Sequence, residues 1–104
     1  SIGITGDIRV FENTPNLLTL ELQTLSITGD ISVFHNSAKL VTLHLDRCDI
    51  TGNIGVFQNT PNLEELHLDV TCVDGDIAVF QFTPSLQDPS IWETDLTGDI
   101  EVFT

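Results

Sequence analysis

The sequence predicts a repeat solenoid of the α/β class, in which successive units coil and stack their strands in parallel. Two observations predict it. Leucines recur at a fixed spacing along the chain. Five glycines also stand 23 residues apart, each inside a nearly constant segment: Gly6, Gly29, Gly52, Gly75 and Gly98. Self-similarity with a period of about 20–50 residues is the mark of a stacked repeat protein.

The segment around each glycine is the first element of the unit. It reads Ile-Thr-Gly-Asp-Ile at residues 4–8 and 27–31, with close variants in the other copies, and a Val-Phe pair follows each time. Glycine and aspartate are typical turn residues, so we expect the Gly-Asp step to be a turn. We expect the phenylalanines to form a buried column on the convex side: Phe11, Phe34, Phe57, Phe80 and Phe103.

A polar turn and a short strand follow within each unit. The Asn-Thr-Pro-Asn cluster at residues 13–16 is turn chemistry that ends one segment before the next begins. The alternation Leu20-x-Leu22 is the period-2 pattern of a strand with one buried face. Each unit is therefore expected to hold one strand, a turn, a short irregular or helical segment and a second turn, so the strands can stack only in parallel.

The leucines follow the pattern Leu-x-x-Leu-x-Leu, which starts at Leu17, Leu40 and Leu63. This pattern resembles the leucine-rich repeat, and the Ile-Thr-Gly-Asp-Ile segment resembles the plant-type LxGxI subclass. The resemblance implies a right-handed coil with a concave parallel β-sheet and a convex side of short 3₁₀ helices or loops. It also implies an extracellular or organelle-lumen location. We expect residues 1–104 to form a single domain of about four and a half 23-residue units, and to be a fragment without its caps.

Two departures from the family pattern carry expectations. The position that is usually asparagine is occupied by Leu25, Cys48, Thr71 and Thr94. Cysteine and threonine can partly satisfy the buried turn carbonyls there. Pro89 stands where a strand leucine of the fourth unit is expected. Because proline cannot donate a ladder hydrogen bond, we expect that strand to be short or distorted.

The negative charge of the chain limits the classes of partner that it can bind. There are 16 Asp and Glu residues against 3 Lys and Arg, which gives a net charge of −13. Such a surface repels phosphate backbones, so we expect no nucleic-acid partner. No run approaches the ~20 apolar residues of a membrane span, so we expect no direct membrane insertion. A basic partner or a cation is the natural complement; the alternative is that the acidity only keeps the array soluble.

Residues between the strand leucines are expected on the concave face, where they differ from unit to unit. One column reads Glu21, His44, His67 and Ser90, and the next reads Gln23, Asp46, Asp69 and Trp92. The two His-x-Asp steps make a transition-metal site or a pH-responsive contact geometrically feasible. The alternative is a pair of exposed histidines with acidic neighbours. Trp92 is either a binding anchor or a cover over the gap left by Pro89.

Two further groups have competing interpretations. Asp7, Asp30, Asn53, Asp76 and Asp99 form a column that either binds calcium or holds its own turns, and the asparagine favours the structural role. For Cys48 and Cys72 we expect two free thiols, the first pointing inward and the second outward, in preference to a disulfide.

The predicted function is non-enzymatic protein–protein recognition through an acidic concave face, since the core positions repeat while the concave positions vary. No nucleophile motif, phosphate loop or CxxC step occurs in the sequence, and no cofactor or metal is predicted. The partner is expected to be a protein with a basic or mixed surface. The predicted partner-binding residues are Glu21, His44, Asp46, Glu65, His67, Asp69 and Trp92. The alternative is a structural accessory subunit or domain packed into a larger assembly, membrane-associated or not.

Overall fold

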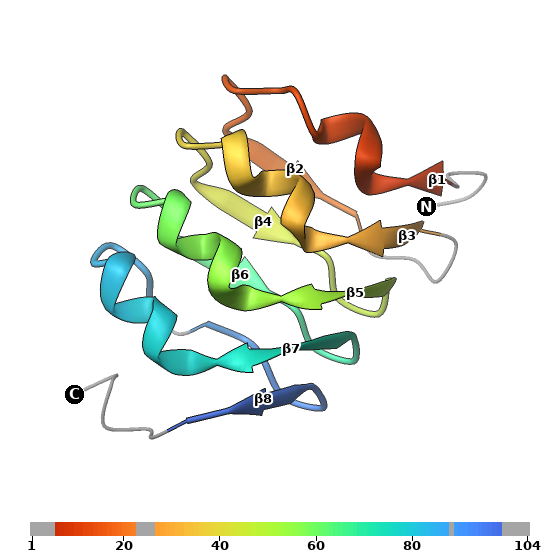
Figure 1. Cartoon of the computed structure of the whole chain (residues 1–104), viewed down its shortest axis with the longest axis vertical. Coiled ribbons are helices and arrows are strands. Elements are labelled where there is room, and N and C mark those ends of the chain that lie inside the picture. The colour runs from red at the N-terminus through yellow and green to blue at the C-terminus, as the bar shows by residue number, and fades with distance from the viewer. Residues whose placement is uncertain (1–5, 23–26, 88, 99–104) are drawn as a thin grey trace.

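The computed structural model describes residues 6–22, 27–87 and 89–98, which form a coil of short strands and 3₁₀ helices (Figure 1). In chain order the elements are β1 (Gly6–Asp7), η1 (Ile8–Phe11), β2 (Thr19–Glu21), β3 (Ile27–Asp30), η2 (Ile31–Asn36), β4 (Thr42–His44), β5 (Asp49–Asn53), η3 (Ile54–Asn59), β6 (Glu65–His67), β7 (Cys72–Asp76), η4 (Ile77–Phe82) and β8 (Asp95–Thr97). The predictions for Gln23, Leu25, Asp99 and Phe103 lie outside the described residues. In this described part of the chain, no helix has the length and apolar character to cross a membrane.

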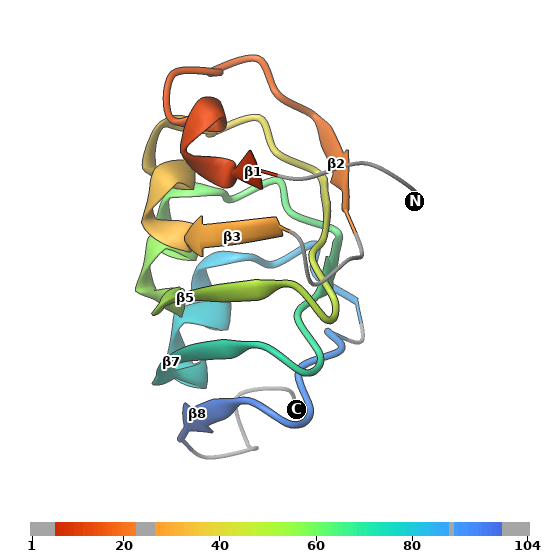
Figure 2. The same ribbon diagram turned by 90° about the vertical axis from the view of Figure 1, so that its right-hand side faces the viewer.

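The strands form two parallel sheets, with the orders β1-β3-β5-β7-β8 and β2-β4-β6. Figure 2 shows the first sheet stacked along the coil, with the helices on one side of it and β2 on the other. Each turn of the coil passes through a strand of the first sheet, a 3₁₀ helix and the strand position of the second sheet. The parallel sheet predicted from the leucine pattern is therefore present.

The prediction of one strand per unit was wrong, because the Thr-Gly-Asp segment is extended instead of forming a turn. Its residues pair with the equivalent segment of the next unit, for example Gly29 with Ile50 and Gly52 with Val73. Backbone hydrogen bonds between units stabilise an extended chain here, and local turn propensity contains no information about them.

An aspartate or asparagine caps each 3₁₀ helix at the end of the preceding strand. The Asp30 carboxylate accepts a hydrogen bond from the Ser32 backbone N–H at 2.8 Å, and the Asn53 amide oxygen accepts one from Gly55 at 2.7 Å. Asp7 and Asp76 make the same contact. These bonds support the structural interpretation of the Asp column over the calcium one, because the side chains already hold the local backbone.

The same capping oxygen lies directly over the glycine of the following unit. A Cβ atom added to Gly29 would lie 2.6 Å from Asp7 Oδ1, and one added to Gly75 would lie 2.6 Å from Asn53 Oδ1. The five repeat glycines also have φ between 117° and 137°, where side chains are strained. The backbone therefore favours glycine at all five positions, and at Gly29, Gly52, Gly75 and Gly98 the available space requires it as well.

The core is a continuous strip between the two sheets and the helices. Ten leucine, isoleucine and valine residues of the two sheets and their flanks are at most 8 % exposed: Leu20, Ile27, Leu40, Leu43, Leu45, Ile50, Leu63, Leu66, Leu68 and Val73. Leu17 and Leu22 of the first unit are partly buried against them. Phe34, Phe57 and Phe80 are buried from the helical side, while Phe11 is partly buried against them. The predicted core face and the predicted inward direction of these phenylalanines are confirmed.

The residues that replace the family asparagine do satisfy carbonyl groups. Cys48 Sγ donates to the Leu22 carbonyl of the preceding unit at 3.1 Å. Thr71 instead donates within its own unit, to the Leu68 carbonyl at 2.7 Å. Cys72 is an exposed free thiol, so the two cysteines are not bonded to each other, as expected.

The fourth strand of the second sheet is reduced to a single bridge between His67 and Ser90. Ser90 N–H donates to the Leu66 carbonyl at 2.9 Å, and its carbonyl accepts from Leu68 N–H at 2.7 Å. Pro89, immediately before it, has no N–H to donate. The expected shortening of this strand is confirmed.

We predict that Gly52→Ala lowers the free energy of unfolding by about 3 kcal/mol or more. The alanine is strained at φ 117°, and its methyl group meets Asp30 and Ile31. Gly6→Ala is the matched control, because Gly6 has φ 137° but no described atom within 4 Å of an added Cβ. The free energy of unfolding of this variant should fall by only about 1–2 kcal/mol, from backbone strain alone. Urea unfolding measures both; equal losses would contradict the proposed role of the capping oxygen.

Candidate functional site

Four of the seven predicted binding residues lie in rows on the β2-β4-β6 sheet, on its side away from the core. This side was predicted to be the concave face, and we call it the outer face. Parallel pairing aligns Glu21 with His44 and His44 with His67. Glu65 lies in a neighbouring row beside Thr42, whose hydroxyl is 3.4 Å from its carboxylate. The structure therefore brings the histidines and the two glutamates onto one face. The remaining three predicted residues follow the strands and adjoin this face.

The imidazole rings of His44 and His67 stack on each other. Their centroids are 4.0 Å apart and their planes differ by 14°. His44 Nδ1 lies 3.8 Å from Glu21 Oε1, and His67 Nδ1 lies 3.5 Å from Asp46 Oδ2. His44 Nε2 is buried and has no hydrogen-bond partner among the described residues. Burial of an unpaired polar atom costs about 1–3 kcal/mol, so the fold gives up stability at this point.

The geometry of the stack does not favour a metal site. An imidazole binds a metal through an in-plane lone pair at about 2.0–2.1 Å. Two nearly parallel rings with centroids 4.0 Å apart cannot direct both lone pairs to one ion. Across residues 6–22, 27–87 and 89–98, no group of three His, Cys, Asp or Glu side chains is arranged to hold a metal ion.

Asp46 and Asp69 have a structural role that the sequence did not indicate. Asp46 Oδ1 accepts a hydrogen bond from the Asp69 backbone N–H at 3.0 Å, and Asp69 Oδ1 accepts one from the Trp92 N–H at 2.9 Å. The Ser90 hydroxyl donates to the other oxygen of Asp69. Each carboxylate is thus held in place by the following unit. Their spacing of 23 residues was the signal that could have revealed this ladder.

The residue that follows each member of this column has an unusual backbone conformation. Arg47, Val70 and Glu93 have φ of 61°, 59° and 59°, in the left-handed region. This region costs a non-glycine residue about 1–2 kcal/mol, and a β-branched valine is a genuine outlier there. The Val70 N–H donates to the Trp92 carbonyl at 3.2 Å, which helps to hold the turn.

These turns border a groove of about 320 Å³, which we call the Trp92 groove. It is lined by Asp46, Arg47, Asp69, Val70 and Trp92. The Trp92 residue is 65 % exposed. It is therefore largely open to solvent instead of packed over the gap left by Pro89, and its role as a binding anchor stays a prediction. The sequence analysis did not identify Arg47 and Val70, because neither arginine nor valine favours a left-handed conformation.

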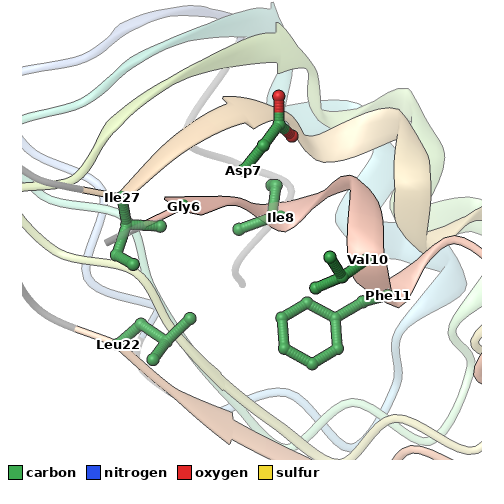
Figure 3. Close-up of a pocket in the computed structure, with 7 residues that line it drawn as sticks. All are labelled: Gly6, Asp7, Ile8, Val10, Phe11, Leu22 and Ile27. Atoms are coloured by element: carbon green, nitrogen blue, oxygen red, sulfur yellow. The ribbon is translucent and has the colours of Figure 1, made fainter. Parts of the chain in front are cut away.

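A second pocket lies at the β1 end of the coil, and none of the predicted binding residues lines it (Figure 3). It measures about 190 Å³ and is lined by Gly6, Asp7, Ile8, Val10, Phe11, Leu22 and Ile27. Val10 is 75 % exposed here, whereas the equivalent Val33 of the next unit is 6 % exposed. This end pocket is therefore the apolar surface that a stacked unit covers elsewhere in the coil.

Comparison with known proteins supports the fold. No protein-family model and no curated protein sequence matches the chain. Among solved structures, it is similar to the plant peptide hormone receptor RGFR1 in complex with RGF2, with a TM-score of 0.77 and 29 % identity over 88 % of this chain and 15 % of the receptor chain. It is also similar to PEPR1 in the PEPR1–AtPEP1 crystal structure, with a TM-score of 0.73 and 22 % identity over 92 % of this chain and 14 % of that one. The fold is a leucine-rich-repeat solenoid, and the chain spans about one seventh of each neighbour.

We predict that His44→Phe raises the free energy of unfolding by about 1 kcal/mol. The substitution removes the unpaired Nε2 while a ring remains to stack on His67. Urea unfolding measures the change. His35→Phe, at an exposed position of η2, is the control and should change stability by less than about 0.5 kcal/mol. A loss of stability in His44→Phe would show that the imidazole nitrogen is satisfied.

We predict that Val70→Asn also stabilises the fold, by about 1 kcal/mol, because asparagine tolerates the left-handed conformation and valine does not. Val10→Asn makes the same chemical change at an exposed residue without positive φ, so it should be close to neutral. Thermal unfolding of both variants tests this. Equal effects in the two variants would contradict the assignment of strain to Val70.

Proposed function

We propose that this chain is a non-enzymatic recognition module that binds an extended polypeptide on the outer face. The observation that carries the proposal is the contrast between fixed core positions and varied exposed positions on one sheet. Core residues such as Leu43 and Leu66 repeat and are fully buried, whereas the row between them changes along the coil from Glu21 through two histidines to Ser90. A scaffold that keeps its core and changes its surface is what recognition requires.

The backbone of this face is held rigidly between units. Leu22 N–H donates to the His44 carbonyl at 2.8 Å, and Leu45 N–H donates to the His67 carbonyl at 2.9 Å. A face that is already ordered loses little conformational freedom when a partner binds. The similarity to RGFR1, which was solved in complex with RGF2, supports a polypeptide as the partner.

The charge of the outer face favours a partner with a basic or mixed surface. Glu21, Asp46, Glu65 and Asp69 lie on or beside it. In the described part of the chain, both ion pairs involve histidine, and no Lys or Arg forms an ion pair with these carboxylates. Complementary charge increases the association rate and excludes acidic partners. The repeated segments, in which Ile, Val or Leu precedes x-Gly-x-Ile, further support assignment to the plant-type LxGxI subclass with a 23-residue period.

The end pocket favours a second candidate function, a structural domain packed against a neighbour within a larger assembly. The exposed Val10 and the partly exposed Phe11 and Leu22 border this pocket. Apolar surface of this kind is stabilised when it is covered. A neighbour seated there would bind at the end of the coil and not on the outer face.

We predict that peptides selected from a displayed random-peptide library bind the outer face. The variant Glu21→Ala/Glu65→Ala/Trp92→Ala should weaken them by about tenfold or more, because it removes two charges and one aromatic anchor. Binding is measured by calorimetry. Glu12→Ala/Asp49→Ala/Phe82→Ala makes comparable changes at exposed positions off this face and should have no effect.

Two results would contradict the proposal. One is the failure of any peptide to bind the wild-type chain. The other is binding that survives the outer-face variant but is lost in Val10→Asp, which places a charge at the end pocket. The second result would favour the structural-domain function.

A further inference from the structure

We propose that the Trp92 groove binds the guanidinium group of an arginine side chain from a partner polypeptide. This inference rests on the proposed function and makes it more specific, because the groove adjoins the outer face. It commits the partner to a basic residue at one position along the bound segment.

The aromatic wall of the groove suits a planar cation. Trp92 is 65 % exposed, while Phe34 and Phe57 in the same chain are fully buried. Tryptophan attracts a cation over its ring more strongly than phenylalanine or tyrosine does. A guanidinium group is flat and weakly hydrated, so it stacks on an indole while its edge remains free to donate hydrogen bonds.

The carboxylates beside the indole are already in position. Asp46 and Asp69 each have one oxygen fixed by a backbone N–H, at 3.0 Å and 2.9 Å respectively. The Ser90 hydroxyl also donates to the second oxygen of Asp69, and Asp46 Oδ2 lies 3.5 Å from His67 Nδ1. A carboxylate has about four acceptor sites, so each still has lone pairs to offer a ligand. Because neither side chain must be ordered on binding, the entropy cost of capturing a donor is small. A guanidinium group is the donor whose fork matches a carboxylate.

Charge complementarity selects a cation over an anion. Two carboxylates and one guanidinium, that of Arg47, line the groove, and the whole chain has a net charge of −13. No described Lys or Arg forms an ion pair with either carboxylate. Arg47 repels an incoming cation, so its removal should strengthen the binding of arginine. It would weaken the binding of an acidic ligand, and this opposite sign makes the proposal testable.

The experiment uses Trp92 as its own reporter, because the chain has one tryptophan and no tyrosine. The probe is acetyl-Gly-Arg-Gly-amide, titrated while indole fluorescence is recorded. We expect a saturable change with a dissociation constant on the order of 1 mM, as befits a single side chain. The same peptide with citrulline, a neutral isostere of arginine, should bind about tenfold more weakly or not at all. Added salt should weaken the arginine signal.

Three variants, each checked for native stability, locate the binding. Asp46→Asn keeps an oxygen for the Asp69 N–H but removes one charge, and should weaken arginine binding by about three- to fivefold. Asp49→Asn makes the same charge change at an exposed position of β5 and should leave binding unchanged. Arg47→Gln should strengthen binding by about two- to fivefold.

Some outcomes overturn the proposal. Equal binding of the citrulline peptide would show that the groove does not recognise a cation. Unchanged affinity for the arginine peptide in Asp46→Asn would also contradict the proposal. So would weaker binding of that peptide in Arg47→Gln if a glutamate peptide binds the wild-type chain. If library-selected peptides bind the outer face while the arginine tripeptide leaves Trp92 unaffected, polypeptide recognition stands and the arginine site falls. If the tripeptide binds but no longer peptide does, the arginine site stands and the proposed function falls.

Discussion

Each unit depends on one side-chain oxygen that caps its own 3₁₀ helix and lies over the glycine of the next unit. Asp30 shows both contacts, since it accepts from Ser32 N–H and leaves no room for a Cβ on Gly52. Removal of the oxygen would release the helix, and a side chain on the glycine would push the units apart. The contact thus joins the cap of one unit to the backbone of the next, at the spacing that the parallel sheets set.

The properties of the outer face are consequences of that spacing. Adjacent strands of a sheet lie about 4.8 Å apart, so equivalent side chains in successive units are close enough to touch. His44 and His67 stack for this reason, and the Asp46 carboxylate reaches the backbone of the next unit. The same residues that could contact a partner therefore also hold the units together. This is why substitutions there must be checked for stability before a loss of binding is interpreted.

The sequence predicted the coil, the buried strip and the rows of the outer face, because every unit repeats the same residue pattern and therefore supports the same arrangement. It failed where the structure depends on bonds between units. The segment around Gly29 was predicted to be a turn, yet it is extended, since its hydrogen bonds go to the segment around Gly52. The left-handed conformation of Val70 contradicts the preference of valine and is imposed by its neighbours. The burial of His44 Nε2 could not be predicted either, because it depends on how the ring packs beside His67.

The Trp92 groove forms where the regularity of the coil ends. In the second and third units, the position two residues after the histidine is Asp46 or Asp69. An oxygen of each accepts a hydrogen bond from the backbone of the following unit. In the fourth unit Pro89 lacks an N–H, the strand is reduced to the bridge at Ser90, and the position equivalent to Asp46 and Asp69 is Trp92. An indole has no oxygen with which to extend the carboxylate ladder. The ladder therefore stops beside an exposed aromatic ring, with the partly buried Asp46 and Asp69 lining the groove next to it. The groove is therefore formed by the same change in residues that interrupts the repeat.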